Sequence, residues 1–454
     1  MIPLDALGPE GERRTRQRET IKDTAGVAVG ELSLVPRLYV ARSIKAQRKV
    51  HPLPAEHREK ALDRAAELFL ESTIGGLDFD AYVELTCRVA GLPMTATREG
   101  ARGVADALAT AFDAVRPARP SGAVTDWRER DTRGGTAVWA RRGDVLGVHA
   151  PGNAPGVHGL WPQALALGYR VAVRPSRREP FTAHRVIHTL RQAGFRCEDA
   201  LYLPTDYAGA GELINAADLA LVYGGQDVVD RYANESTVFT NGPGRSKVLI
   251  TAEQDWRDHI DVIVDSVCKY GGMACVNATA VLYEGDATPL AQAIAERLAT
   301  IPPLPNTDVR SLLPTAPVES ARAVADHLAI KAAGTIPVLG SDQVVADLGN
   351  GYAALRPAVH LLASPDERTL NVELPFPCVW VASWSRDDGL APLRNSLALS
   401  LITDDEQLVD DLLNEPTVTN VYVGGYPTYF GAPHVPHDGF LADFLMWNKG
   451  FART

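Results

Sequence analysis

The sequence is poor in cysteine, lacks long apolar runs, and carries fewer basic than acidic residues. Five cysteines are scattered over 454 residues, an odd number that predicts no disulfide framework and suits a reducing compartment. No stretch approaches the about 18 consecutive apolar residues of a membrane span, and no apolar signal region follows the first residues. We therefore expect a cytoplasmic protein without a membrane partner, and the net charge of −11 argues against nucleic-acid binding.

What is present is typical of a globular enzyme, with 46% hydrophobic and 22% charged residues. The one local excess of positive charge runs from Arg13 to Arg18. Because Glu12 and Glu19 flank it, we expect a solvated and poorly ordered N-terminal segment.

Short β-rich apolar runs alternate with helical periodicity from Val145 onward, which predicts parallel sheets with crossover helices and an α/β class. Residues 54–115 read as helical, and further helices are expected at 182–193, 253–268 and 288–299. The expected strands are Val145–His149, Arg170–Arg174, Leu219–Tyr223, Lys247–Ile250 and Ala280–Tyr283.

Cys275 follows the small residues Gly271-Gly272-Met273-Ala274 and precedes an apolar, strand-like stretch. A thiol at such a place can act as a nucleophile, with its own backbone N–H free to hold an oxyanion. An isolated cysteine is more often a small buried hydrophobic residue, so the surrounding motifs have to decide.

Five further motifs occur in a fixed order: Pro151-Gly-Asn153, Arg174-Pro-Ser176-Arg177, Gly224-Gly225, Asn241-Gly-Pro-Gly-Arg-Ser-Lys247 and Glu373-Leu-Pro-Phe376-Pro-Cys378. Together with the Cys275 segment they resemble the aldehyde dehydrogenase superfamily over roughly residues 130–450. The resemblance implies a Rossmann-type cofactor domain (1–241), an α/β catalytic domain (242–420) and a C-terminal oligomerisation arm and tail (421–454). Residues 135–141 would join the small β arm, and a homo-oligomer is implied.

By the same resemblance, Cys275 is the catalytic nucleophile and the Asn153 side chain donates to the oxyanion. Relatives that hydrolyse the thioacyl-enzyme have a glutamate where this chain has Asn241. An amide cannot take a proton from water, so we expect the acyl group to leave to a thiol. The sequence thus resembles the acylating branch and the long-chain acyl-CoA reductases.

The function expected is reduction of an acyl thioester, carried by coenzyme A or by a carrier-protein phosphopantetheine, to an aldehyde through thioacyl-Cys275. The alternative is a hydrolytic aldehyde dehydrogenase whose base comes from elsewhere, with Glu235, Asp206 or His149 as candidates. An acyl-phosphate reductase and a non-catalytic scaffold are further alternatives.

The resemblance also places Arg174, Ser176, Arg177, Gly224, Gly225, Glu373 and Phe376 around the cofactor. Arg177 stands where relatives have a glutamate that repels a 2′-phosphate. An arginine there offers a planar phosphate-binding fork, so we expect NADP(H), with NAD(H) as the alternative.

The remaining candidates receive structural interpretations. His434-Val-Pro-His437 has a spacing that suits a metal, but lacks further ligands nearby, so we expect a surface loop and no metal site. His158 and Trp161 either face an acyl pocket or lie in the core. Cys268 is expected to pack in the core.

Overall fold

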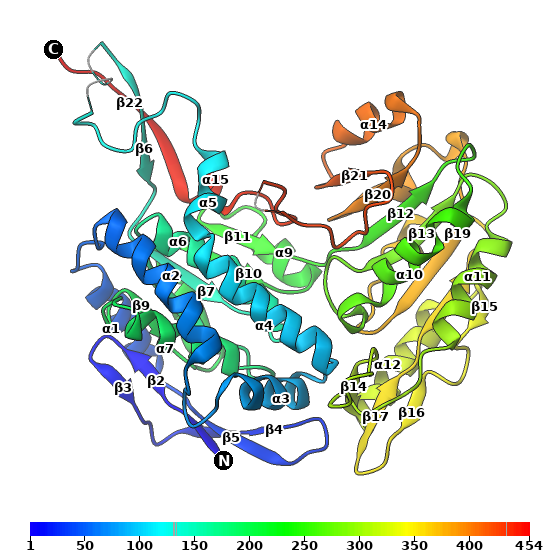
Figure 1. Ribbon diagram of the computed structural model, residues 1–454, viewed down its shortest axis with the longest axis horizontal. Helices are drawn as coiled ribbons and strands as arrows, with labels where there is room; N and C mark the ends of the chain where they lie inside the picture. Colours follow the sequence, from blue (N-terminus) through cyan, green and yellow to red (C-terminus); the bar gives the residue numbers. More distant parts are fainter. Residues whose placement is uncertain (130–131, 133, 433) are drawn as a thin grey trace.

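The chain forms two lobes and a projecting two-stranded arm in a computed structural model that describes residues 1–129, 132, 134–432 and 434–454 (Figure 1). Each lobe is built on a seven-stranded, mostly parallel sheet. The predicted α/β class is therefore confirmed.

The sheet of the first lobe has the strand order β11-β10-β7-β8-β9-β2-β3. Its parallel strands are β7 (Val145–His149), β8 (Arg170–Arg174), β9 (Ala200–Tyr202), β10 (Leu219–Tyr223) and β11 (Val238–Asn241). The antiparallel strands β2 (Ala6–Gly8) and β3 (Gly11–Arg13) extend one edge. The helices of this lobe are α1 (Arg37–Gln47), α2 (Ala55–Glu71), α3 (Phe79–Ala90), α4 (Met94–Ala109), α5 (Ala111–Val115), α6 (Pro162–Ala166), α7 (Phe181–Gln192), α8 (Tyr207–Ala216) and α9 (Gln226–Tyr232).

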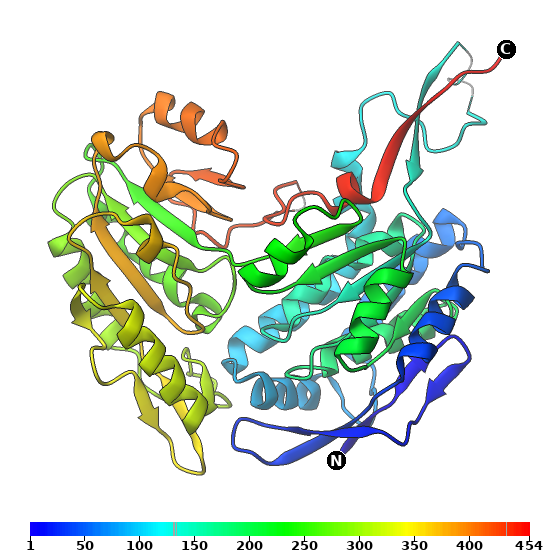
Figure 2. The same cartoon turned by 180° about the vertical axis from the view of Figure 1, so that it is seen from behind.

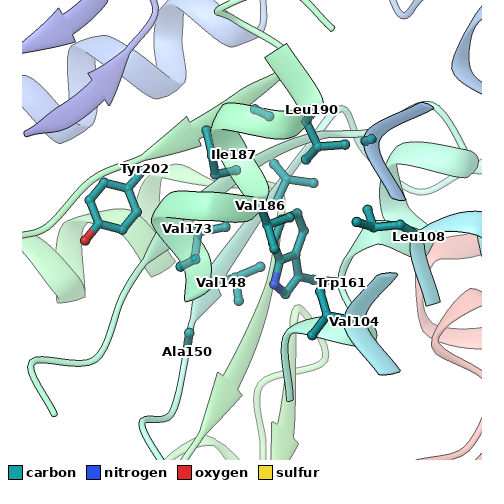
Figure 3. Packing of buried hydrophobic residues seen from close by; sticks show 14 of the residues in the cluster. Val104, Leu108, Val148, Ala150, Trp161, Val173, Val186, Ile187, Leu190 and Tyr202 are labelled. Atoms are coloured by element: carbon teal, nitrogen blue, oxygen red, sulfur yellow. The ribbon is translucent and has the colours of Figure 1, made fainter. Parts of the chain in front are cut away.

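The core of the first lobe explains why the strands are apolar on both faces. Figure 3 shows Val148 and Val173 from the sheet packed near Val186 of α7 and Val104 of α4. Helices cover the sheet, so alternating polar residues have no place in its central strands. The predicted strands at β7, β8 and β10 are confirmed residue for residue.

The expectation of a poorly ordered N-terminus is wrong. The strands β1 (Ile2–Leu4), β5 (Ala28–Ser33) and β4 (Arg18–Lys22) form a three-stranded sheet. Arg18 Nη1 lies 2.8 Å from Glu31 Oε2 on the neighbouring strand. The charges that suggested a solvated tail thus include a cross-strand ion pair.

The sheet of the second lobe has the order β15-β18-β19-β13-β12-β20-β21. These strands are β12 (Ser246–Ile250), β13 (Ala278–Tyr283), β15 (Ile336–Leu339), β18 (Ala358–Leu361), β19 (Cys378–Ser383), β20 (Leu399–Ile402) and β21 (Val421–Val423). The helices are α10 (Ile260–Cys268), α11 (Thr288–Ala299), α12 (Val318–Lys331), α13 (Glu367–Leu370) and α14 (Glu406–Leu413). A small antiparallel sheet joins β14 (Thr315–Pro317), β17 (Tyr352–Leu355) and β16 (Val345–Asp347).

After β21 the chain crosses back to the first lobe, as Figure 2 shows from behind. It forms α15 (Leu441–Leu445) and then β22 (Met446–Phe451), which pairs antiparallel with β6 (Thr136–Arg141) in the arm. The described residues of this crossing segment, 424–432 and 434–440, connect the second lobe to α15. Within the described part of the chain, none of the helices has the length and apolar character that a membrane span requires.

Candidate active site

Cys275 and Asn153 come from different lobes and meet at their junction. Asn153 follows β7, and Cys275 lies in the loop that leads into β13. Asn153 Nδ2 donates to the carbonyl oxygen of Met273, two residues before the thiol, at 3.4 Å. Its Oδ1 is buried and has no protein partner. The structure therefore brings the two predicted catalytic residues to one place.

The loop before Cys275 is held in an unusual backbone conformation. Tyr270, Gly271 and Gly272 have φ values of 55°, 71° and 66°, a left-handed run that glycine tolerates and tyrosine does not favour. A Cβ on Gly272 would lie 2.4 Å from the backbone nitrogen of Pro377. The loop is thus pressed against the segment that follows Glu373.

Asn277 secures the same loop from its other end. Its Oδ1 accepts from the N–H of Ala274 at 2.8 Å, and its Nδ2 donates to the carbonyl oxygens of Ser266 and Lys269. The sequence analysis did not single out Asn277. A polar residue at the start of an apolar strand was the signal available, because a buried amide needs several partners.

The segment that joins the two lobes also supports the loop that carries Cys275. A Cβ on Gly244 would lie 1.7 Å from the carbonyl oxygen of Cys275, so only glycine fits this approach. The hydroxyl of Ser246 donates to the same carbonyl at 3.1 Å. Lys247, whose Nζ donates to the carbonyl oxygens of Arg245 and Arg394, fixes the segment below it. These contacts hold the backbone of Cys275 in position.

His437 and its neighbour Asp438 lie in the loop between β21 and α15. The Nε2 of His437 lies 3.3 Å from Asp438 Oδ2. The carbonyl oxygen of His437 accepts from Asn420 Nδ2 at 2.7 Å, which ties the crossing segment to the second lobe. His434 is exposed and His437 is partly exposed, and both lie in a loop as expected.

The charges around Cys275 act in opposite directions. Burial raises the pKa of the Cys275 thiol, and His437 opposes this increase. Burial acts to lower the pKa of His437, whereas Asp438 and Cys275 act to raise it.

Glu373 is the second carboxyl group at the junction. Its Oε2 accepts from the backbone N–H of Gly244 at 3.2 Å. Burial raises the pKa of Glu373 to about 7, while the Gly244 hydrogen bond and the charge of Arg245 act against that rise. A carboxyl group with this pKa can exchange protons near neutral pH.

Asn241 ends β11. Its Nδ2 is buried and has no hydrogen-bond partner. Of the alternative bases, Glu235 is exposed, and Asp206 accepts from Gly209 N–H as the N-cap of α8. His149 ends β7, 2.9 Å from Arg174. Glu373 instead accepts a hydrogen bond from Gly244, which packs against the backbone of Cys275.

Five of the predicted cofactor residues, all but Glu373 and Phe376, lie at or just after the carboxyl ends of the first lobe's strands, where open α/β sheets bind their ligands. Arg174 ends β8, and Arg177 Nη1 lies 3.1 Å from Glu19 Oε2. The Nε atoms of both arginines are buried and have no protein partner. Ser176 Oγ accepts from Arg178 N–H at 3.1 Å, on the rim of the same edge.

Gly224 and Gly225 connect β10 to α9, and Gly225 is the N-cap of that helix. A Cβ on Gly224 would lie 2.5 Å from the side chain of Val228, so the turn is tightly closed. On the opposite side, the ring of Phe376 is buried in the second lobe's core and is only 1% exposed. Phe376 thus anchors the loop that carries Glu373, and cofactor binding by these residues stays a prediction.

Burial decides whether His158 and Trp161 face an acyl pocket or lie in the core. Both side chains are fully buried, and Trp161 Nε1 donates to His158 Nδ1 at 3.2 Å. They belong to the core. Cys268 packs half-buried against the core of the second lobe, close to the expectation.

The fold and this site define a class of protein: a two-lobed α/β protein with a cysteine at the lobe junction, an asparagine amide beside its loop and the carboxyl edge of a parallel sheet in the first lobe. A sequence model of the aldehyde dehydrogenase family matches residues 24–442. The chain belongs to this family. A comparison with curated protein sequences returned no significant match.

Solved structures agree with the fold. The aldehyde dehydrogenase KauB from Pseudomonas aeruginosa has a TM-score of 0.84 at 16% identity, covering 99% of this chain and 96% of that chain. An indole-3-acetaldehyde dehydrogenase from P. syringae in complex with NAD⁺ has 0.83 at 16% identity, with the same coverage. A 3,6-anhydro-L-galactose dehydrogenase in complex with NADP has 0.80 at 16% identity and 99% coverage of both chains.

Proposed function

We propose that this enzyme reduces an acyl thioester to an aldehyde with NADP(H), through a thioacyl intermediate on Cys275, and that it catalyses the reverse reaction with the same groups. The observation that supports this most is the chemistry of position 241. Its Nδ2 is buried without a partner, and an amide cannot remove a proton from water. A thiolate needs no such base, so a thiol is the acyl acceptor that this site suits.

The first lobe has residues that suit a nicotinamide cofactor. The unpartnered Nε atoms of Arg174 and Arg177 suit a phosphate or ribose of its adenosine half, and Gly224 and Gly225 permit close approach of a diphosphate. When bound, the cofactor supplies or accepts the hydride. Arg177 in the place of an acidic residue favours NADP(H) over NAD(H).

Oxidation of an aldehyde to a carboxylic acid is the second candidate. The solved structures with this fold are named as aldehyde dehydrogenases, which favours this reaction over thioester reduction. Glu373 also offers a carboxyl group with a pKa of about 7 beside Gly244. If Glu373 activates water, position 241 is not needed as a base.

One experiment separates the two functions. The enzyme is mixed with an aldehyde and NADP⁺ without a thiol, and NADPH is followed by its absorbance. The thioester function predicts a burst of about one NADPH per site, then a stall, and steady turnover after coenzyme A is added. Steady, thiol-independent formation of acid would instead establish the hydrolytic function, and Glu373→Gln should then abolish it.

In the arm formed by β6 and β22, the outer edge of β22 pairs with no other strand among the described residues, whereas Val124 is hydrogen-bonded to the outer edge of β6. Because unpaired strand edges tend to pair with another chain, we propose a homo-oligomer assembled through the arm. Its size in solution can be measured by light scattering.

A further inference from the structure

Two arginines share one carboxylate at the amino ends of β7 and β8. Asp144 directly precedes β7 and Arg170 begins β8, and Arg170 Nη2 lies 3.0 Å from Asp144 Oδ1. Arg141 Nη2 lies 3.4 Å from the same oxygen, and its Nη1 donates to the carbonyl oxygen of Gly168. The Nη1 of the buried Arg170 has no hydrogen-bond partner among the described residues. The positive charge of this group therefore exceeds its negative charge.

Arg58 of α2 brings a third guanidinium group to the same place. It donates to the carbonyl oxygens of Leu53 and Ala166, which carry no net charge. A Cβ on Gly168 would lie 3.5 Å from Arg58 Nη1, so Arg58 and Arg141 both approach this glycine. Burial, and next the charge of Arg141, lower the pKa of Arg58 to about 10. Arg58 is thus still a cation at neutral pH, close to a second one.

Arg58, Arg141 and Asp144 line a cavity of about 700 Å³ at the base of the arm, between β6, α2 and α5 (Figure 1). The described lining residues include five arginines and a single acidic residue, Asp144. Other parts of the wall are apolar and include Phe112 and Met446. Sites for small molecules typically have volumes of about 300–1,000 Å³, so this cavity is large enough to hold one.

The acidic residues around the cavity balance only part of its positive charge. Arg116, on the outer wall, lies 2.7 Å from Asp113 and 4.0 Å from Glu59, so its charge is compensated. At the rim, a Glu129 oxygen accepts from the backbone N–H of Thr125. The three inner arginines still share one carboxylate, in a chain whose net charge is −11. A cavity with such an excess of positive charge attracts anions.

We propose that this cavity binds a small organic phosphate, with the phosphate group at Arg58 and Arg141 and the organic part against Phe112 and Met446. Guanidinium groups bind phosphate oxygens through paired, charge-assisted hydrogen bonds. A phosphate ester carries a charge of about −1.5 to −2 at neutral pH, which matches two guanidinium groups better than the single charge of a carboxylate does.

The proposed phosphate site is separate from the candidate active site. It lies at the amino ends of β7 and β8, whereas the predicted cofactor residues of the first lobe lie at the carboxyl ends of its strands. Strands of five residues place these two edges about 15 Å apart. Binding there does not depend on which reaction the enzyme catalyses.

The test is isothermal titration calorimetry of the whole protein with phenyl phosphate at pH 8, and with phenol as the neutral comparison. The wild type should bind phenyl phosphate at least about tenfold more tightly than phenol, and added salt should weaken this binding. No binding of phenyl phosphate, or equal affinity for the two compounds, would overturn the proposal.

Two variants locate the site. Arg141→Gln removes one of the two phosphate-binding guanidinium groups, while Asp144 keeps its ion pair with Arg170, and it should weaken binding of phenyl phosphate by at least about tenfold. Arg119→Glu reverses the charge of an exposed lining residue and should weaken binding at least about threefold. Melting temperatures establish that both variants are folded, and Arg119→Glu decides the question if Arg141→Gln is not.

The matched control for Arg119→Glu is Arg102→Glu, which makes the same change of charge at an exposed position of α4 outside the cavity lining. It should bind phenyl phosphate as the wild type does, and so should Arg177→Glu, at the predicted cofactor edge. Wild-type affinity in folded Arg141→Gln or Arg119→Glu, an equal loss in Arg102→Glu, or a loss confined to Arg177→Glu would place the phosphate elsewhere and overturn the proposal.

Discussion

Replacement of Gly244 by alanine should displace the nucleophile without touching its chemistry. The added Cβ would lie 1.7 Å from the carbonyl oxygen of Cys275, 2.4 Å from its carbonyl carbon and 2.8 Å from its Cα. Real Cβ contacts are essentially never shorter than 3.0 Å, so the two backbones must separate by about 1.3 Å. Both are backbone atoms, and rotation of a side chain cannot relieve the clash.

The surrounding hydrogen bonds direct the movement towards the loop that carries Cys275. The N–H of Gly244 donates to Glu373, and its carbonyl oxygen accepts from the N–H of Leu397 at 2.8 Å, so the segment is held on both sides. A displacement of about 1 Å at reacting atoms costs about 10²-fold in rate. We therefore expect Gly244→Ala to lower the single-turnover rate of NADPH formation from an aldehyde by about 10²-fold.

The matched control is Gly242→Ala in the same segment. Its Cβ would meet only the side chain of Val229, at 2.7 Å, and that side chain can rotate. Gly242→Ala should keep a rate within about threefold of the wild type and a similar melting temperature. If Gly244→Ala reacts at the wild-type rate, the tight backbone contact does not position Cys275, and the reasoning fails.

Three further outcomes follow from the same structure. Asn153→Ala should lower turnover by about 10²–10³-fold with little change in cofactor affinity, since it removes an oxyanion donor; a change confined to KM would contradict that role. Arg177→Glu should lower the NADP(H) over NAD(H) preference in kcat/KM by about tenfold, although its pairing with Glu19 already offsets part of its charge; an unchanged ratio would remove Arg177 from phosphate binding. Burial lowers the pKa of His158 to about 4. As the pH falls, His158 is therefore protonated in the unfolded state before it is protonated in the folded state. The folded state loses free energy of unfolding between about pH 6.5 and 4 for this reason. His158→Gln should therefore lessen the acid loss of unfolding free energy by about 2–3 kcal/mol in urea titrations at pH 7.5 and 4.5, and an equal loss in both proteins would show that His158 does not cause it.

The sequence determined the local elements where the pattern of apolar residues is clear. The strands β7, β8 and β10 are continuous apolar runs, because helices cover both faces of a central parallel strand, and their bounds could be predicted from the sequence. The N-terminal strands could not, since β4 carries charged residues whose pairing with β5 depends on a distant segment. Cross-strand partners such as Glu31 are invisible to a local pattern.

The candidate site was likewise predicted from the sequence only in part. Cys275 and Asn153 were predicted from motifs, because a nucleophile and its oxyanion donor need particular residue types in a fixed chain order. The contact of Gly244 with the Cys275 backbone was not predicted, because a local pattern does not show which distant segment a glycine approaches. This glycine contact, and the hydrogen bond from Asn153 to the loop before Cys275, are decided only by tertiary structure, because both depend on distances between segments that the sequence does not place together.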